Sequence, residues 1–179
     1  LLTTLTGCGQ AKETGGALEP VTLNEVAHSI FYAPQYAAIE LGYFKDEGIA
    51  LTLVNGAGAD KVMTALISGD ADIGFMGSEA SIYVYQEGSA DYAVNFAQLT
   101  QRAGNFLVGR SAEPDFSWQD LKGKKVLGGR AGGMPEMVFE YILKKNGIDP
   151  KNDLTIDQSI NFGLTAAAFT SNDADYTVV

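Results

Sequence analysis

The 179-residue sequence has very few of the residues that most often carry metal or nucleophilic chemistry, with one cysteine, Cys8, and one histidine, His28. No disulfide can form within one chain, and no Cys/His cluster has the spacing of metal ligands. Basic residues are also scarce, because 12 Lys and Arg stand against 22 Asp and Glu, for a formal net charge of -10. Since nucleic-acid binding relies on a basic surface, this balance argues against a nucleic-acid partner. The sequence predicts no metal site and no cofactor.

Long apolar runs are missing as well, and none approaches the roughly 18 residues that a transmembrane helix needs. The N-terminal stretch "LLTTLTGCGQAKETGG" instead joins a short apolar run to a polar, glycine-rich segment at Cys8. Leu5-Thr6-Gly7-Cys8 resembles the bacterial lipobox, in which signal cleavage leaves a lipidated cysteine at the N-terminus. The basic part of a signal peptide is absent, so we expect the sequence to begin inside that peptide. A chance match is the alternative.

Residues 1–19 are therefore predicted to be a signal-peptide remnant, the lipobox and a flexible tether. The lipid on Cys8 would anchor an extracytoplasmic protein to the bacterial cell membrane. The whole sequence is 46% hydrophobic and 19% charged, which suits one substantial domain or two small lobes.

From Val21 onward, short apolar strands alternate with helical patterns. The expected strands cover residues 21–27, 49–54, 71–76, 124–128, 153–160 and 174–179, and the expected helices cover 34–44, 59–69, 78–88, 134–147 and 162–171. Three landmarks recur in the same order in both halves: a helix-starting proline (Pro34 and Pro135), a Gly-Ile pair and an Asp-Ala-Asp triplet. We interpret the halves as two α/β lobes, residues 20–108 and 109–179, with the linker around residues 105–118.

Alternating strands and helices predict parallel sheets, and such sheets bind ligands beyond the carboxyl ends of their strands. Applied to both lobes, this rule predicts two facing loops, "HSIFYAP" (His28–Pro34) and "GRAGGMP" (Gly129–Pro135). The second loop fits neither the dinucleotide fingerprint nor the Walker loop, because the required glycines and Gly-Lys-Ser/Thr are absent. Paired glycines at Gly132 and Gly133 would let the backbone approach a ligand closely.

Four stretches of this chain resemble a known family. They are "FYAPQYAAIELGYFKDEGIALTLV", "ALISGDADIGFMGSEA", "WQDLKGKKVLGG" and "KKNGIDP". They resemble the extracytoplasmic solute-binding proteins of ABC importers, and within these the nitrate/sulfonate/taurine and thiamin-pyrimidine-precursor group. The resemblance covers most of residues 21–179 and does not specify the ligand.

The resemblance implies a two-lobed clamshell, the type II periplasmic-binding-protein fold, with parallel-type sheets flanked by helices. It also implies capture of one small-molecule solute between the lobes and delivery to the subunits of an ABC permease. Family chains are usually much longer, and the sequence stops within an apolar strand run at Val179. We therefore expect a truncated C-terminus that lacks the return segment to the first lobe, and a monomer for the full-length protein.

Carried over by position, the resemblance predicts a ligand-binding set drawn from both lobes. Its members are Ser29, Phe31, Tyr32, Gly77, Ser78, Glu79, Gln101, Arg102, Arg130, Gly132, Gly133 and Met134. Alternatives stay open for several of them. Phe31 and Tyr32 are adjacent and cannot both point into the cleft, whereas Glu79 would also favour a helix N-terminus electrostatically. Arg102 and Arg130 suit solvated loops equally, and His28 suits a packed loop.

Two ligand classes fit this set. A small oxyanion such as nitrate or an alkanesulfonate calls for helix N-termini, hydroxyls and a guanidinium. A flat nitrogen heterocycle calls for an aromatic face and a carboxylate that accepts from ring N–H groups. Glu79 and Glu136, together with Phe31 and Tyr32, favour the heterocycle.

Two other classes of function are weighed against a binding protein. An enzyme on the same fold is disfavoured, because Cys8 belongs to the lipobox and His28 has no evident partner for acid–base chemistry. A regulatory effector-binding domain would follow a DNA-binding helix-turn-helix and would lack a lipobox.

The lipobox prediction is tested by replacing Cys8 in the protein expressed with its complete signal in a bacterial host. Because several acyl chains on one residue are needed for stable anchoring, Cys8→Ser should move the protein into soluble fractions. Fractionation followed by immunoblotting measures this, with the unaltered protein as reference. Membrane association that survives the substitution would contradict the lipid anchor.

Overall fold

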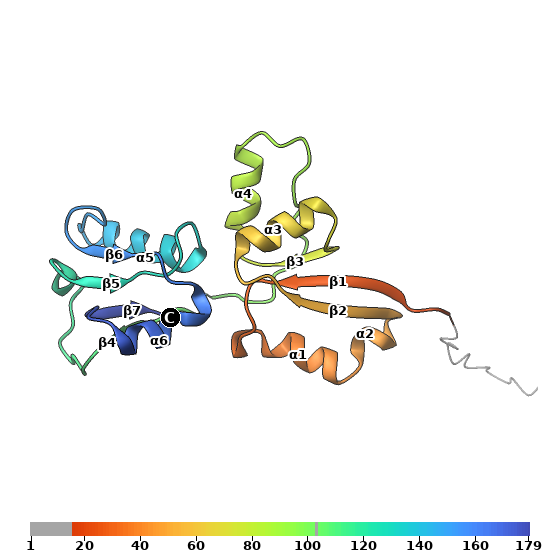
Figure 1. Cartoon of the computed structure of the whole chain (residues 1–179), viewed down its shortest axis with the longest axis horizontal. Coiled ribbons are helices and arrows are strands. Elements are labelled where there is room, and N and C mark those ends of the chain that lie inside the picture. The colour runs from red at the N-terminus through yellow and green to blue at the C-terminus, as the bar shows by residue number, and fades with distance from the viewer. Residues whose placement is uncertain (1–15, 103) are drawn as a thin grey trace, which may run out of the picture.

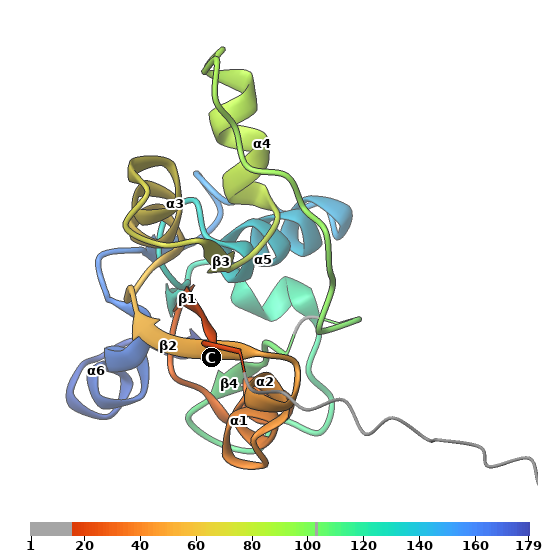
Figure 2. The ribbon, with the colours of Figure 1, turned by 90° about the vertical axis from the view of Figure 1, so that its right-hand side faces the viewer.

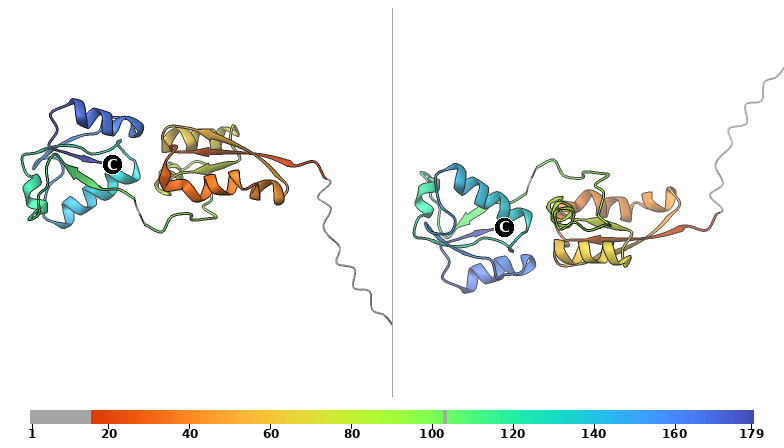
Figure 3. Two further views of the ribbon diagram at one scale, coloured as in Figure 1. Left: turned by 90° about the horizontal axis from the view of Figure 1, so that it is seen from below. Right: turned by 90° about the horizontal axis from the view of Figure 1, so that it is seen from above.

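The computed structural model describes residues 16–102 and 104–179, so the lipobox and lipidation site predicted at Cys8 lie outside the described residues. Figure 1 shows two lobes side by side, with the connecting segment running from α4 in the first lobe to β4 in the second. Each lobe is built on one β-sheet, and Figure 3 shows helices on both faces of each sheet. The α/β class predicted from the alternating pattern is confirmed.

The first sheet has three strands in the order β2-β1-β3, with β1 (Glu19–Glu25) in the centre. Both neighbours, β2 (Ile49–Asn55) and β3 (Ile73–Phe75), pair with it in parallel, as predicted. The register aligns Glu25 with Asn55 on one side and with Phe75 on the other. The carboxyl ends of all three strands therefore lie at one edge, which faces the second lobe in Figure 1.

Four α-helices cover this sheet: α1 (Ala33–Glu40), α2 (Tyr43–Asp46), α3 (Ala59–Ser68) and α4 (Glu79–Gln86). Figure 2 shows α1 and α2 on one side of the sheet and α3 on the other. A short 3-10 turn, η1 (Ile30–Tyr32), precedes α1. The single helix expected over residues 34–44 is divided, because Gly42 adopts a left-handed conformation with φ 80° and restarts the chain as α2.

The second sheet has four strands in the order β4-β7-β5-β6. Their bounds are Leu107–Gly109, Lys125–Leu127, Thr155–Asp157 and Tyr176–Val178 for β4 to β7. The central strand β5 is parallel to both neighbours, as predicted, but β4 is antiparallel to β7. The chain enters this lobe from the side toward which β5 and β7 run, so its first strand must run the opposite way (Figure 1).

Strand β4 also corrects the linker, which was predicted over residues 105–118. Leu107 pairs with Val178 and Gly109 pairs with Tyr176, so these residues belong to the second sheet. The strand spans the predicted lobe boundary between residues 108 and 109. The connection between the lobes lies upstream, in the irregular segment between α4 and β4.

Helices α5 (Met134–Lys145) and α6 (Thr165–Ser171) cover the second sheet, with the 3-10 turns η2 (Trp118–Leu121) and η3 (Phe162–Leu164) at its margins. The buried core of this lobe consists of Leu121, Val126, Phe139, Leu143, Ile148, Leu154, Tyr176 and Val178. Ser117 and Asp120 form a capping box at η2, where the Asp120 carboxylate accepts from the Ser117 N–H at 2.8 Å. Within the described ranges, no helix combines the length and apolar character required to span a membrane.

Arg110, directly after β4, ties the C-terminal end of α6 to the sheet. Its guanidinium donates to the carbonyl oxygens of Phe169 (2.9 Å), Asn172 (2.6 Å) and Ala174 (2.7 Å), and it lies 4.4 Å from the centre of the Phe169 ring. The last carbonyls of a helix have no partners within the helix and carry its negative dipole end, so a cation is favourable there. The residue thus holds a short helix whose own hydrogen bonds are few.

We expect Arg110→Lys to lower the free energy of unfolding of the second lobe by about 1–2 kcal/mol, because an ammonium cannot reproduce the fork that reaches three carbonyls. Urea unfolding measures the change. Lys151→Ala, at an exposed position after α5, serves as the control and should change the free energy little. Equal stability of Arg110→Lys and the unaltered protein would contradict this role of Arg110.

Candidate functional site: the junction of the two lobes

The glycine-rich turn of the second lobe and the start of α5 lie against α3 and α4 of the first lobe, at the junction of the two lobes. The contacts that cross this junction include three that involve side chains. The Met134 N–H donates to Glu79 Oε1 at 3.2 Å, the Tyr83 hydroxyl donates to the Met137 sulfur at 2.9 Å, and Arg130 forms an ion pair with Asp60. The first two contacts join α4 to α5, so the N-terminal parts of these helices lie against one another.

Glu79 is the most constrained acid at the junction. It is the first residue of α4 and only 4% exposed, and burial raises the pKa of its carboxyl against the opposing effect of the backbone N–H groups of Glu79 and Met134. Oε1 accepts from Met134, whereas Oε2 is buried without a hydrogen-bond partner. The carboxylate lies against the backbone of Gly77, where a Cβ atom would collide with it. A buried acceptor with one free oxygen is costly unless a ligand supplies the donor.

A second buried carboxylate, Glu25, stands at the carboxyl end of β1. It is 1% exposed, and its two oxygens bind His28 Nδ1 (2.9 Å), Gln35 Nε2 (3.0 Å) and the Tyr36 hydroxyl (2.9 Å). His28 is therefore engaged as a packed loop residue, with its ring 4.3 Å from that of Tyr36. Sequence reasoning missed Glu25, although a charged residue at the carboxyl end of a strand was the signal that pointed to it.

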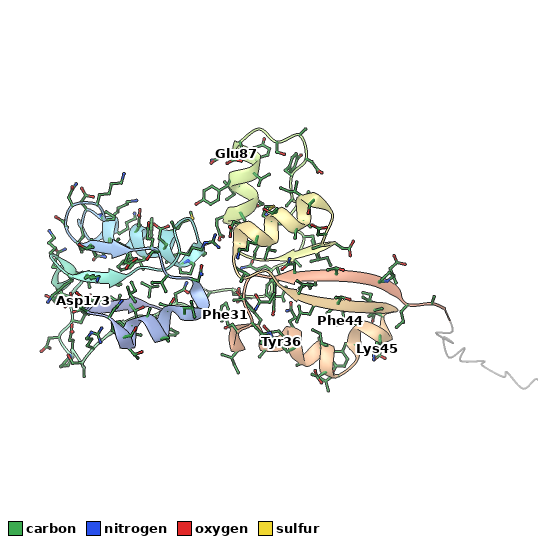
Figure 4. All side chains as sticks on the ribbon, viewed as in Figure 1. Phe31, Tyr36, Phe44, Lys45, Glu87 and Asp173 are labelled. Atoms are coloured by element: carbon green, nitrogen blue, oxygen red, sulfur yellow. The ribbon has the colours of Figure 1, made fainter. Side chains whose placement is uncertain are left out.

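Aromatic side chains from the first predicted loop line the same edge of the lobe. The Tyr32 ring lies 4.5 Å from the Phe75 ring, and burial, followed by Tyr36, Glu25 and Glu79, raises the pKa of its hydroxyl. Phe31 is 39% exposed, and Figure 4 shows it on the side of the first lobe that faces the second. Its ring packs on the connecting segment, where a Cβ atom at Gly104 would lie 2.6 Å from it. The two adjacent rings thus have different surroundings.

The glycines of the glycine-rich turn have different backbone conformations. Left-handed φ angles occur at Gly129 (82°) and Gly132 (75°), whereas Gly133 has an extended φ of -85° and precedes α5 as its N-cap. A residue other than glycine would therefore be strained at Gly129 and at Gly132, but not at Gly133. At Gly133 a Cβ atom would lie 3.3 Å from the Arg130 carbonyl oxygen, so there the limit is space.

Glu136, in the first turn of α5, serves its own lobe. Its carboxylate accepts from the Gly132 N–H at 3.2 Å and from Gln158 Nε2 at 2.9 Å, so both oxygens are engaged. Burial and the neighbouring Glu140 carboxyl raise the pKa of Glu136. The structure therefore gives Glu136 a role in shaping the turn.

The other predicted site residues contribute less. The Ser29 hydroxyl accepts from the Phe31 N–H at 3.3 Å and caps η1, and Ser78 is an exposed residue at the start of α4 whose side chain makes no capping bond. Gln101 and Arg102 are exposed on the connecting segment, and neither hydrogen-bonds to another member of the predicted set within the described residues. The junction thus brings together Tyr32, Gly77, Glu79 and Met134 and leaves this pair apart.

Two further features bear on where a ligand binds. An open cavity of about 550 Å³ lies within the second lobe, lined mainly by apolar side chains that include Phe106, Trp118 and Ile142. It offers few polar groups to orient a ligand, whereas the junction offers a buried carboxylate and two helix N-termini. Among residues 16–102 and 104–179, no cluster of His, Cys, Asp and Glu has the arrangement of a metal site.

Comparison with known proteins identifies relatives of this chain. A family model described as NMT1/THI5 like matches residues 30–179. The chain is 48% identical over 176 residues to "Putative binding protein YtlA" of Bacillus subtilis (strain 168), an alignment that covers 98% of this chain and 52% of that relative. The chain therefore spans about half the length of the curated relative that it matches.

Solved structures share the fold at lower identity. A protein from Bordetella bronchiseptica RB50 superposes with a TM-score of 0.67 at 24% identity, covering 89% of this chain and 50% of that one. The periplasmic aliphatic sulphonate binding protein SsuA of Escherichia coli gives 0.58 at 18% identity, over 90% and 54% of the two chains. The alkanesulfonate-binding SsuA of Xanthomonas axonopodis pv. citri, bound to MOPS, gives 0.59 at 18%, over 92% and 54%.

The periplasmic-binding-protein fold predicted from the sequence is thereby confirmed, and so is the resemblance to solute-binding proteins at the level of the family. Since the family model matches residues 30–179 of a 179-residue chain, this chain belongs to the NMT1/THI5-like family.

Proposed function

We propose that the protein is an extracytoplasmic solute-binding protein, which captures one small molecule between its lobes and delivers it to an ABC-type permease. Family membership and the shared periplasmic-binding-protein fold support this proposal. The observation that carries it is the buried Glu79 Oε2, an acceptor without a partner at the junction of the lobes. Membrane attachment through Cys8 is part of the same proposal.

The ligand that we propose is a flat nitrogen heterocycle, such as a pyrimidine precursor, that presents an N–H or amino donor. Glu79 Oε2 would accept from that donor inside a site with little access to water, where a hydrogen bond to a carboxylate is strong. Tyr32 and Phe31 offer aromatic faces at the same edge of the first lobe. The Met134 N–H already engages the other oxygen and orients the carboxylate.

An oxyanion is the second candidate, since two of the proteins that share the fold are named for sulfonate binding. The charges at the junction disfavour it here. Glu25 and Glu79 are buried acids, and Asp60 occupies the guanidinium of Arg130. An oxyanion would meet acceptors where it needs donors. A catalytic role is not proposed, because the relative's name describes a binding protein and Glu25 already engages His28.

Native mass spectrometry of the purified complete protein tests the proposal, because tight binders often retain their ligand. Thermal titration with aminopyrimidines and, separately, with nitrate, taurine and short alkanesulfonates then separates the two ligand classes. Stabilisation by the first set alone supports the heterocycle, and stabilisation by the second set alone assigns the oxyanion. A response to neither set, together with no retained ligand, would contradict solute capture by these classes.

Glu79→Gln is the sharpest variant for the ligand class. Glutamine keeps an acceptor for the Met134 N–H but places an NH2 donor where Oε2 would accept from the ligand. We expect aminopyrimidine binding to weaken by about tenfold to a hundredfold, because a lost partner at a buried site costs about 1–3 kcal/mol. Isothermal titration measures the loss, and Glu87→Gln, which removes a charge from the exposed end of α4, is the control. Unchanged binding by Glu79→Gln would remove this carboxyl from the site.

The same variant tests the pKa of Glu79 without a ligand. Because burial raises the pKa of this carboxyl in the folded state, its contribution to stability is greatest below its unfolded pKa and is lost as pH rises through the folded value. Glutamine does not titrate, so Glu79→Gln should gain stability relative to the unaltered protein between acid and neutral pH. Melting curves at several pH values measure this difference. A difference that is constant with pH would contradict the raised pKa.

Substitutions at Gly132 and Gly133 should have different effects on stability and on ligand binding. Gly133→Val adds bulk at the N-terminus of α5 at a backbone φ that valine can adopt, with its Cβ 3.3 Å from the Arg130 carbonyl oxygen, so ligand binding should fall while the lobe still folds with a modestly lower melting temperature. Gly132→Val forces a β-branched residue into a left-handed φ of 75° and should lower stability by about 1 kcal/mol or more. Melting curves and ligand titration of both variants provide the measurements. Tight binding by a stable Gly133→Val protein would place the ligand elsewhere.

A further inference from the structure

Asp60 and Arg130 form an ion pair that joins the two lobes, and of the two residues the sequence pointed only to the arginine. Asp60 lies in the first turn of α3 in the first lobe, and Arg130 lies in the glycine-rich turn of the second lobe. The contact is a two-pronged fork, with 2.6 Å between Nη1 and Oδ1 and 2.6 Å between Nη2 and Oδ2. This parallel geometry gives directional preference as well as attraction.

The surface of the first lobe is shaped to receive the guanidinium. Gly58 is buried with a φ of 146°, and a Cβ atom there would collide with Arg130 Nη1. The preceding Ala57 also has a left-handed φ of 55°, and its N–H donates to Asn55 Oδ1 at 2.9 Å. The loop that ends β2 thus holds two unusual conformations that open a place for the side chain of the other lobe.

The ion pair is connected to the candidate site through the backbone of the turn. The Arg130 carbonyl oxygen accepts from the Gly133 N–H at 3.1 Å, which closes the turn directly before α5. The next N–H, that of Met134, donates to Glu79 Oε1. A shift of Arg130 relative to the first lobe would therefore move the N–H group that orients the Glu79 carboxylate.

The charges and the exposure of the two side chains determine how strong the ion pair is and which equilibrium it affects. Burial tends to raise the pKa of Asp60, but the Arg130 guanidinium outweighs it and holds that pKa below its ordinary value. The two side chains are 34% and 57% exposed for Arg130 and Asp60, so the attraction is modest and sensitive to salt. Since each lobe has its own sheet, breaking the pair changes the balance between open and closed lobes more than the folding of either lobe.

We infer that Asp60 is a positioning residue, which docks the glycine-rich turn of the second lobe on the first by holding Arg130 above Gly58. This inference deepens the proposed function, because the docked turn is part of the proposed ligand site. Arg130, which was predicted to contact the ligand, instead acts on the closure of the lobes. Closure then brings the Met134 N–H to Glu79 whether or not a ligand contacts the arginine.

The test is the distance between spin labels on the two lobes of the complete protein without added ligand. Labels are placed at Glu47→Cys and Lys151→Cys, both exposed, in a Cys8→Ser background that removes the native thiol. The parent protein should show a population with the lobes in contact. Asp60→Asn and Arg130→Gln should each reduce the ratio of closed to open forms by about twofold to fivefold, the range expected for a partly exposed ion pair.

Coupling between the two positions separates docking from a general loss of charge. The double variant should open the lobes no further than either single variant, and the exchange Asp60→Arg with Arg130→Asp should restore part of the closed population. The control is Asp173→Asn, which breaks an ion pair with Lys125 that has the same 2.6 Å separation but lies within the second lobe. Figure 4 shows Asp173 at the side of that lobe away from the junction, so the label distance should not change.

Any one of three results would overturn the inference. They are a longer label distance in the Asp173→Asn control, additive effects in the double variant, and an unchanged label distance in Asp60→Asn. A parent protein with no closed population would overturn it as well. Because the measurement requires no ligand, a failure to bind aminopyrimidines would count against the proposed function and leave the docking result intact. Melting temperatures close to that of the parent protein confirm that each variant is folded.

Discussion

Parallel pairing of β1 with both of its neighbours determines where nearly every polar feature of the first lobe lies. When strands run in one direction, their carboxyl ends meet at one edge, and the helices that follow begin there with unpaired N–H groups. Glu25 ends β1, Asp60 opens α3 and Glu79 opens α4, so three acids gather along one edge. The second lobe presents the start of α5 to the same junction, after β5.

The acids at this edge differ in the partners of their carboxylate oxygens, and this difference gives each acid a separate role. Glu25 has partners for both oxygens and serves as the internal support of the His28 loop. Asp60 has a cation from the other lobe, which suits a contact that forms when the lobes meet. Among these three acids, only Glu79 has a buried oxygen without a hydrogen-bond partner in the described structure. A carboxylate in that condition is the natural place for a donor that arrives from outside the chain.

Several features of the fold follow from local sequence signals whose physics does not depend on distant residues. Prolines placed the starts of α1 and α5, the Gly69 and Gly147 left-handed turns followed helix ends, and Ser117 with Asp120 formed a capping box. Each signal acts over a few residues of the chain, through a fixed φ, a permitted left-handed φ or a side chain that reaches the nearest N–H. Gly42 shows the limit of such local signals. The helical pattern of apolar side chains continues across Gly42, but the left-handed backbone of this residue divides the predicted helix into α1 and α2.

The sequence by itself determined the α/β class, the two-lobed organisation, the parallel pairing of β1 and β5 with their neighbours, and the place of the glycine-rich turn between β5 and α5. These follow from periodicity, turn chemistry and the rule for strand ends. Only the tertiary structure decided that β4 joins the second sheet, that Glu25 and Asp60 belong to the junction, and that Gly132 carries the left-handed φ. The reason is separation along the chain: Arg130 meets Asp60 across 70 residues, and no local pattern in either segment specifies its partner in the other lobe.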